Sequence, residues 1–342
     1  MPKKILFICG SLNQTTIMHQ IARRMFGYPC YFTPFYADGI IGLLSKTKLL
    51  DFTILGGRHR KATQAYLAKE KLPVDFGGRL QDYDTVVTCT DLIIQRNIRG
   101  KRLLLIQEGI TEPENWLYSL VRYMKLPRFL ANTAATGLSD LYDFFCVASP
   151  GYRDFFIRKG VKPEKIIVTG IPNFDNAKQY LNNDFPYKDY VLVATSSIRE
   201  TKKFDDRTQF LREANKIAAG RQILIKLHPN EDHKRAQQEI LETIPQAMVF
   251  TDSDINPMIA NCAVLITQYS SVVYTGIALG KEVHSYYDRS ALHALMPIQN
   301  GGRSAQRIAE VCKQLVRIPQ SELIHFRQKG YLRRRRQISD AH

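Results

Sequence analysis

The chain has 342 residues, 44% of them hydrophobic, and 48 Lys and Arg against 32 Asp and Glu give it a formal net charge of +16. This length favours two domains of ordinary size, and the composition excludes a disordered protein. No apolar stretch approaches the roughly 18 residues of a membrane span, and the apolar run 5–9 is too short for a signal peptide. The tail 327–342 holds six Arg or Lys and one Asp, so +11 remains on the body, which predicts anionic partners.

Six cysteines are spread along the chain without a CxxC spacing, at Cys9, Cys30, Cys89, Cys146, Cys262 and Cys312. Four of them fall in or beside apolar, strand-like runs, which is typical of buried free thiols in a reducing compartment. We therefore expect a cytoplasmic protein. The eight histidines are dispersed and no acidic pair stands out, so we predict no metal site.

Short apolar runs alternate with longer amphipathic segments throughout the first half of the chain. We predict strands over residues 4–9, 31–35, 85–89, 103–107, 144–148 and 165–169, and helices over 14–26, 62–70 and 150–159. The strands are uniformly apolar rather than alternating, which indicates a parallel sheet covered on both faces.

The pattern breaks over the polar residues 174–189, a good linker, and then restarts. Strands are predicted over 190–194, 222–227, 247–251, 263–267 and 282–286, and helices over 207–218, 232–243 and 305–316. We therefore predict an α/β protein with two Rossmann-like, doubly wound parallel-sheet domains, 1–173 and 190–320, that face a cleft and precede a basic tail, 321–342. Ligands of such sheets bind beyond the carboxyl ends of the strands, where every motif below lies.

Ser270 and Ser271 follow the predicted strand 263–267 and open a short helix that Gly280 closes. A helix N-terminus presents hydroxyls and main-chain N–H groups where the helix dipole is positive, and in α/β proteins this arrangement commonly binds phosphate. The alternative is that the serines only cap the helix. The turn favours a nucleotide-linked substrate, and the predicted site includes Tyr269 beside it.

His228 ends the strand 222–227, and Pro229 after it prevents an immediate turn into a helix. The imidazole is therefore held at the strand tip, where it contacts a phosphate or leaving group, or else bonds a nearby carbonyl. Lys226, two residues earlier, joins the predicted donor site.

The loop 195–203 follows the first strand of the second half. It supplies the hydroxyls of Ser196 and Ser197 and then three cations, the first of them Arg199. This composition fits a contact with the donor phosphates, and a solvated basic loop is the alternative.

Together these motifs resemble the nucleotide-sugar transferases of the GT-B architecture, which have two Rossmann-like domains. The most similar families are the teichoic-acid-type CDP-glycerol glycerophosphotransferases and the UDP-N-acetylglucosamine 2-epimerase-like group. Residues 267–283 resemble the pattern T-D-Y-S-S-V-x-F-E-x-L-x-L-G-K-P-V of the former, with changed chemistry at Gln268, Thr275 and Glu282. The resemblance implies a donor phosphate at the turn and places Thr275 where an acid would bind the donor's ribose.

A second element, residues 160–175, is similar to the G-V-x-P-E-K-I-x-V-T-G-N-P-x-x-D segment that closes the first domain in these families. The resemblance covers residues 144–287 well and the first 140 residues loosely. It implies a transferase whose substrate is a nucleotide-activated sugar or glycerol, and whose acceptor is an envelope polysaccharide or a lipid-linked molecule. Because hydroxyls, N–H groups and cations can hold the phosphates, we expect no metal and no other cofactor.

Two carboxylates follow strands of the first half. Glu108 ends the strand 103–107 and resembles the Glu of the epimerase group's H-x-E-A-G, which serves acid–base chemistry. Asp91 stands where that group has G-D. A carboxylate here can deprotonate an acceptor hydroxyl, as an inverting transfer requires. The alternative for Glu108 is that it only forms an ion pair with a nearby Arg or Lys. The alternative for Asp91 is that it caps a helix.

Other polar loops of this edge contain Gly10, Ser11 and Arg58, which we assign to the acceptor side. Arg58 belongs to a basic run, 58–61, that holds an anionic acceptor or is simply solvated. Residues 115–130 contain the only Trp and mix aromatics with Arg122, Lys125 and Arg128. Such a segment fits a peripheral contact with anionic lipid, to which the Arg-rich tail could add, and buried domain core is the alternative.

Three functions therefore stay open. The first is a metal-independent glycosyl- or glycerophosphotransferase, with Glu108 or Asp91 as the base and His228 stabilising the leaving nucleotide. The second is a 2-epimerase-like enzyme in which the same acids act on the sugar ring. The third is a basic nucleic-acid-binding protein, which only the charge supports, since no binding motif appears.

Overall fold

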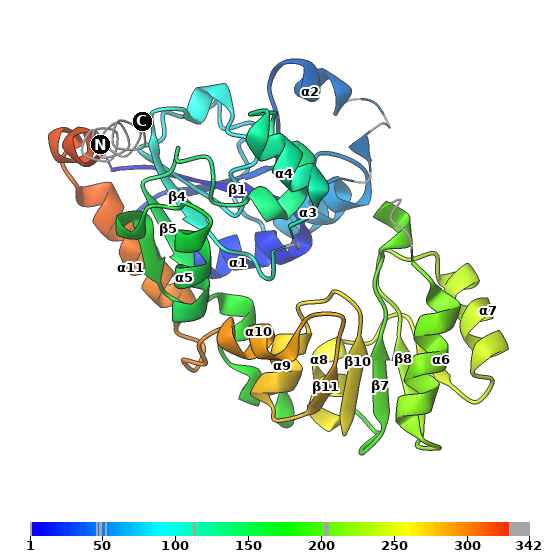
Figure 1. Ribbon diagram of the computed structural model, residues 1–342. Helices are drawn as coiled ribbons and strands as arrows, with labels where there is room; N and C mark the ends of the chain where they lie inside the picture. Colours follow the sequence, from blue (N-terminus) through cyan, green and yellow to red (C-terminus); the bar gives the residue numbers. More distant parts are fainter. Residues whose placement is uncertain are drawn as a thin grey trace, which may run out of the picture. The chain divides into compact units, whose positions relative to one another are not determined.

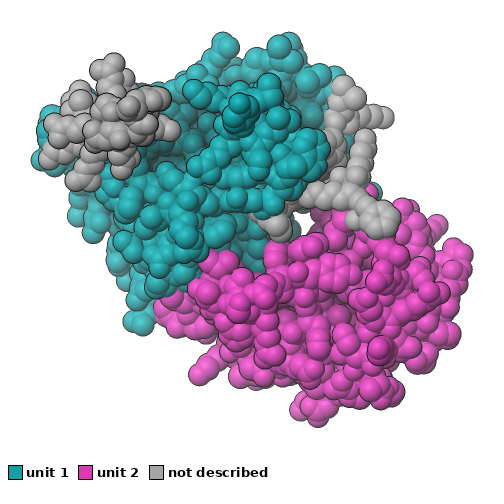
Figure 2. Space-filling view, viewed as in Figure 1, with its two compact units in different colours: residues 1–175, 302–342 teal, residues 176–301 magenta. Residues whose placement is uncertain are grey.

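A computed structural model describes residues 2–327 except 46, 48, 49, 52, 112, 113 and 202–204. The Arg-rich run 333–336 and Lys202 and Lys203 of the basic loop lie outside the described residues. The chain divides into two compact units, which Figure 2 shows in two colours. Unit 1 comprises residues 1–175 and 302–342, and unit 2 comprises residues 176–301.

Unit 1 contains a six-stranded sheet in the order β2-β1-β3-β4-β5-β6 (Figure 1). Its strands are β1 (Ile5–Cys9), β2 (Cys30–Pro34), β3 (Thr85–Thr88), β4 (Arg102–Ile106), β5 (Phe144–Val147) and β6 (Ile166–Val168). All the pairs are parallel, and the central strands β1, β3, β4 and β5 are almost wholly buried, as their unbroken apolar runs predict. The predicted parallel α/β architecture is confirmed.

The helices of unit 1 include α1 (Leu12–Ala22), α2 (Gly39–Leu44), α3 (Gly57–Lys69), α4 (Trp116–Tyr123), α5 (Pro150–Arg158) and α11 (Ser304–Arg317). Short 3₁₀ segments lie at η2 (Arg96–Ile98), η3 (Arg128–Ala135), η4 (Pro163–Lys165) and η5 (Pro172–Phe174). Helices α1, α3 and α11 pack their apolar sides on one face of the sheet, around Phe7 and Leu104. The ring of Phe156 on α5 packs on Phe145 of the opposite face.

Unit 2 contains a five-stranded parallel sheet in the order β11-β10-β7-β8-β9. Its strands are β7 (Val191–Ala194), β8 (Ile223–Lys226), β9 (Met248–Phe250), β10 (Val264–Thr267) and β11 (Glu282–His284). Its helices are α6 (Arg207–Ala218), α7 (His233–Thr243), α8 (Ile255–Asn261), α9 (Val273–Ala278) and α10 (Arg289–Ala294), with 3₁₀ turns η6 (Ala177–Leu181) and η7 (Arg199–Thr201). The buried sides of α6 and α7 cover one face of the sheet and α8 covers the other.

The chain returns to unit 1 at its end, which differs from the predicted domain boundaries. The sequence pattern grouped the helix 305–316 with the second domain, whereas α11 buries Ile308 and Cys312 in the core of unit 1 beside Ile5. The carboxylate of Asp175, the last residue of the first segment of unit 1, accepts the main-chain N–H of Ser304 at 2.7 Å. This bond joins that segment to the start of α11. The expected linker, 174–189, contains η6 and belongs to unit 2 from residue 176.

All six cysteines are free thiols, and five of them are buried. Burial raises the pKa of Cys9 and of Cys146 to about 12, so these thiols are poor nucleophiles at neutral pH. Within the described ranges, we find no helix with the length and apolar character needed to cross a bilayer.

Candidate functional site

Three neighbouring strands of unit 2 end in register, and the predicted donor-binding residues follow them. Thr267 of β10 pairs with Ala194 of β7, which in turn pairs with Lys226 of β8. The loops after these three residues therefore leave the same edge of the sheet side by side. The tips of β10 and β8 flank that of β7, so Ser196 and Ser197 lie between the serine turn and His228.

The loops after β7 and β10 are joined by a side-chain amide. Gln268 is buried, and its carbonyl oxygen accepts the Ser196 hydroxyl at 2.6 Å, while its amide nitrogen donates to Asp205. An amide can accept from one partner and donate to the other, whereas a second carboxylate here would face Asp205. This pairing accounts for Gln268 at a position where the resembling pattern has Asp.

His228 lies at the tip of β8, as predicted, and Glu231 holds it there. Its main-chain N–H donates to the Glu231 carboxylate at 2.9 Å and to the Thr195 hydroxyl at 3.0 Å. The ring Nδ1 accepts the main-chain N–H of Asn230 at 3.1 Å. The neutral ring therefore carries its proton on Nε2.

Below these loops lies a buried ion network that the sequence did not reveal. Arg207 donates to Glu231 at 2.7 Å and to Asp205 at 3.3 Å, and all three side chains are about 2% exposed or less. Arg207 also donates to the carbonyl of Ser196 at 3.1 Å. The network thus couples the tips of β7, β8 and β10, through Ser196, Glu231 and the Asp205–Gln268 bond.

The serine turn leads into a short helix, as predicted, but the N-cap of that helix is Val272, so both serines precede the cap rather than open the helix themselves. Helix α9 has six residues, Val273–Ala278, and Gly280 follows it with φ +69°. The Ser270 hydroxyl accepts the N–H of Val272 at 3.4 Å. Among the described residues, neither the Ser271 nor the Ser197 hydroxyl makes a hydrogen bond, and both side chains are partly exposed. These two hydroxyls are therefore available to a ligand.

Tyr269 precedes this turn and is 48% exposed. Its ring makes edge contacts with the rings of Tyr286 and Tyr287, with centroids 5.4 and 5.2 Å away, which lie after β11. The sequence analysis did not identify Tyr286 and Tyr287 as site residues. The aromatic group lies beside the serine turn and presents partly exposed rings.

Three other predicted donor residues are engaged elsewhere. Arg199 makes a bidentate ion pair with Glu239 at 2.8 and 2.7 Å, and Lys226 donates to the carbonyls of Leu227 and Thr251, both at 2.7 Å. Burial lowers the pKa of Lys226. Thr275 is buried in α9. We therefore base the donor site on the serines and His228.

Glu108 follows β4 in unit 1, and its carboxylate accepts hydrogen bonds from three side chains at the start of α1. The Ser11 hydroxyl lies 2.9 Å from the carboxylate and the Asn13 amide 3.0 Å, and the Gln14 amide donates to its other oxygen. Ser11 also caps α1 by accepting the N–H of Gln14. Gly10 makes this arrangement feasible, because a Cβ there would stand 1.7 Å from the Gln14 side-chain oxygen.

His59 is an additional ionisable group near Glu108. It lies one turn before Thr63 on α3, and the Thr63 hydroxyl donates to the Gly10 carbonyl at 2.8 Å, so this side of α3 faces the Ser11 loop. Burial lowers the pKa of His59, and the nearby Glu108 charge partly opposes that shift. Arg58, the predicted acceptor contact, is exposed.

The lowered pKa of His59 predicts that the stability of the fold depends on pH. Because the unfolded chain protonates this ring at a higher pH than the folded chain does, the free energy of unfolding should fall as pH drops through the ordinary histidine value of about 6.5. We expect His59→Gln to reduce that fall, measured by urea unfolding at pH 7 and pH 5. An identical fall in the variant would contradict this. Part of the fall should remain in the variant, because burial also lowers the pKa of His19.

Asp91, the second predicted acid, is fully buried after β3. Its two carboxylate oxygens accept the main-chain N–H groups of Gly137 and Ser139, both at 2.9 Å. The side chain therefore holds the loop 137–139, whereas the other predicted acid, Glu108, is partly exposed.

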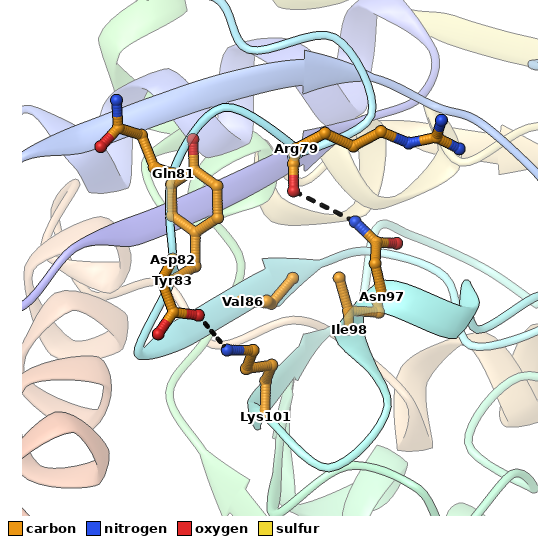
Figure 3. A pocket seen from close by; sticks show the side chains of 9 residues that line it. Arg79, Gln81, Asp82, Tyr83, Val86, Asn97, Ile98 and Lys101 are labelled. Atoms are coloured by element: carbon orange, nitrogen blue, oxygen red, sulfur yellow. Dashed lines mark hydrogen bonds and ion pairs between the residues drawn. The ribbon is translucent and has the colours of Figure 1, made fainter.

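A pocket of about 280 Å³ lies at the opposite, amino edge of the unit 1 sheet (Figure 3). Tyr83, before β3, and Lys101, before β4, line it, and Lys101 is paired with Asp82. None of the predicted site residues lines this pocket. In the part of the chain that is described, no three His, Cys, Asp or Glu side chains come together as metal ligands.

The two parallel sheets, each with polar residues at its carboxyl edge, define an α/β fold with two Rossmann-like domains, as in the GT-B architecture. A UDP-GlcNAc 2-epimerase from Neisseria meningitidis, bound to UDP-GlcNAc, matches with a TM-score of 0.57 and 11% identity, over 91% of this chain and 100% of that one. The S. aureus MnaA–UDP co-structure matches with a TM-score of 0.54 and 14% identity, over 95% of this chain and 90% of that one. The wall teichoic acid polymerase TagF matches with a TM-score of 0.48 and 12% identity, over 92% of this chain and 90% of that one. At these identities, the first two matches establish the fold alone.

Residues 131–288 match the family described as CDP-Glycerol:Poly(glycerophosphate) glycerophosphotransferase. No curated protein matches the sequence. The resemblance inferred from the serine turn and the 160–175 element is thereby confirmed, and the chain is a transferase.

Proposed function

We propose that the protein is a metal-independent glycosyl- or glycerophosphotransferase that uses a nucleotide-activated donor to modify an envelope polysaccharide or a lipid-linked acceptor. The observation that carries the proposal is the family match over 131–288, because this range contains the polar ends of β7, β8 and β10. The three strand ends converge on one edge, where the hydroxyls of Ser197 and Ser271 are available to a phosphate. CDP-glycerol is the donor that the family's description favours.

In this proposal we give each unit a separate task. In unit 2, the hydroxyls of Ser197, Ser270 and Ser271 bind the donor diphosphate, and Nε2–H of His228 donates to the phosphate that leaves with the nucleotide. In unit 1, Glu108 accepts the proton of the acceptor hydroxyl. The acceptor oxygen forms its bond to the donor's carbon or phosphorus as the bond to the nucleotide phosphate breaks.

The donor assignment is tested by nucleotide binding. We expect one of CDP, UDP, GDP or ADP to raise the melting temperature in the presence of EDTA, since a ligand at 100 times its Kd adds about 2.7 kcal/mol to stability. Ser271→Ala and His228→Ala should each weaken that binding by about 10-fold or more, because each removes a hydrogen bond to a charged group.

Thr243→Ala serves as the control, because this hydroxyl bonds the Glu239 carbonyl at 2.8 Å in the last turn of α7, at the end of that helix remote from the strand tips. No shift with any nucleotide, or full binding by both site variants, would overturn the proposal. Isomerisation of a UDP-sugar without an acceptor would instead identify the 2-epimerase-like enzyme. Tight, salt-sensitive RNA binding would identify the nucleic-acid-binding protein.

We further propose that the enzyme works in the cytoplasm at the inner face of the cell membrane. Free thiols throughout the chain fit a reducing compartment, and a lipid-linked acceptor requires access to a bilayer surface. The net charge of +16 suits an anionic surface.

A further inference from the structure

Helix α4 presents an apolar stripe to the outside. Trp116 is 75% exposed and Tyr123 is 89% exposed, with the exposed Leu120 and Met124 between and beside them. Positions 116, 120, 123 and 124 lie on one face of a helix. The opposite face already has its packing partners, because Tyr118 and Val121 are buried against alanines of η3. The exposed stripe is therefore not the unit's own core.

The charges around this stripe are of one sign. Residues 116–130 contain Arg122, Lys125 and Arg128 and no Asp or Glu, a net of +3. Arg122 and Lys125 are exposed. The nearest acid along the chain, Glu114, is paired with Lys159 at 3.3 Å. A helix with exposed Trp and Tyr flanked by cations has the composition of an interfacial membrane contact.

A second apolar helix leaves the same edge of the sheet. Helix α2 follows β2, as α4 follows β4, and the strands are parallel, so both helices lie beyond the carboxyl edge of the unit 1 sheet (Figure 1). None of the six residues of α2 is buried, and Ile40, Leu43 and Leu44 are exposed. Glu108 follows β4 at this edge, eight residues before Trp116.

We propose that α4, together with α2, is a docking surface for an anionic phospholipid bilayer. A second copy of the chain is disfavoured as the occupant because it carries the same positive charge, whereas an anionic bilayer attracts Arg122 and Lys125 while Trp116 and Tyr123 enter the headgroup region. The proposal deepens the proposed function, on which it rests for its purpose: lipid-linked acceptors would reach Glu108 from the surface that α4 contacts.

The test is co-flotation of the full chain with phosphatidylcholine vesicles, with and without phosphatidylglycerol, in the absence of nucleotide. We expect binding only to the anionic vesicles. Each basic residue near such a surface contributes about 1 kcal/mol, so Arg122→Gln/Lys125→Gln should weaken binding roughly 10- to 30-fold. Trp116→Ser/Tyr123→Ser should weaken it at least 10-fold, because it removes two interfacial aromatic rings.

The matched control is Phe26→Ser, since Phe26 is 81% exposed but lies after α1, outside this face. It should bind vesicles like the wild type. The docking surface is overturned if the wild type stays with the lipid-free fraction, if both double variants float normally, or if the control loses as much as they do. Self-association that Trp116→Ser/Tyr123→Ser abolishes would also overturn it, in favour of a second copy. Nucleotide-induced thermal shifts in the same variants report on the proposed function separately.

Discussion

Glu108→Gln should lower the rate of transfer by a factor of about 10² to 10⁴, the usual contribution of a positioned general base. The amide is close in size to the carboxylate but cannot accept a proton from the acceptor hydroxyl. Ser11, Asn13 and Gln14 orient the native carboxylate, so the loss should appear in kcat. The measurement is nucleotide release at saturating donor and acceptor.

Two comparisons make this result specific. Donor binding, read from the nucleotide-induced thermal shift, should be unchanged in Glu108→Gln, because the proposed donor site lies in unit 2. Glu164→Gln, an exposed acid in η4, should retain the full rate. A Glu108→Gln enzyme that transfers at the wild-type rate would remove Glu108 from the mechanism, while leaving the donor assignment standing.

Glu231→Ala should have the largest effect on stability, a loss of about 3–5 kcal/mol in the free energy of unfolding. The substitution leaves Arg207 buried with only Asp205, at 3.3 Å, as a charged partner. It also removes an acceptor for the Thr195 hydroxyl and for the N–H of His228. Urea unfolding at neutral pH measures the change.

Glu242→Ala on α7, the helix that follows Glu231, is the control, because its exposed carboxylate accepts the Gln238 amide at 2.9 Å. Its loss should stay within about 1 kcal/mol. Equal losses in the two variants would show that the Arg207 network contributes no more than a surface contact. Because Glu231 also positions His228, we expect weaker nucleotide binding by Glu231→Ala even where the variant is fully folded.

Many of the elements could be predicted from local pattern. The uniformly apolar runs predicted the strands of both sheets to within one or two residues, since a parallel sheet covered on both faces needs apolar side chains on both sides of each strand. The short helices α2, α4, α8 and α10 were not predicted, because six to eight residues give too little periodicity. The serine turn and the tip position of His228 followed from Gly280 and Pro229.

The amino-acid sequence by itself determined the class of fold, the resemblance to the glycerophosphotransferases and the strand ends at which Glu108, His228 and Ser271 lie. Only the tertiary structure decided which of the polar residues are available to a ligand. Asp91 and Arg199 have suitable chemistry and position in the sequence, yet their charges are taken up by Gly137, Ser139 and Glu239. Such partners are distant along the chain, and the cost of burying an unpaired charge, which selects them, arises only when the fold brings them together.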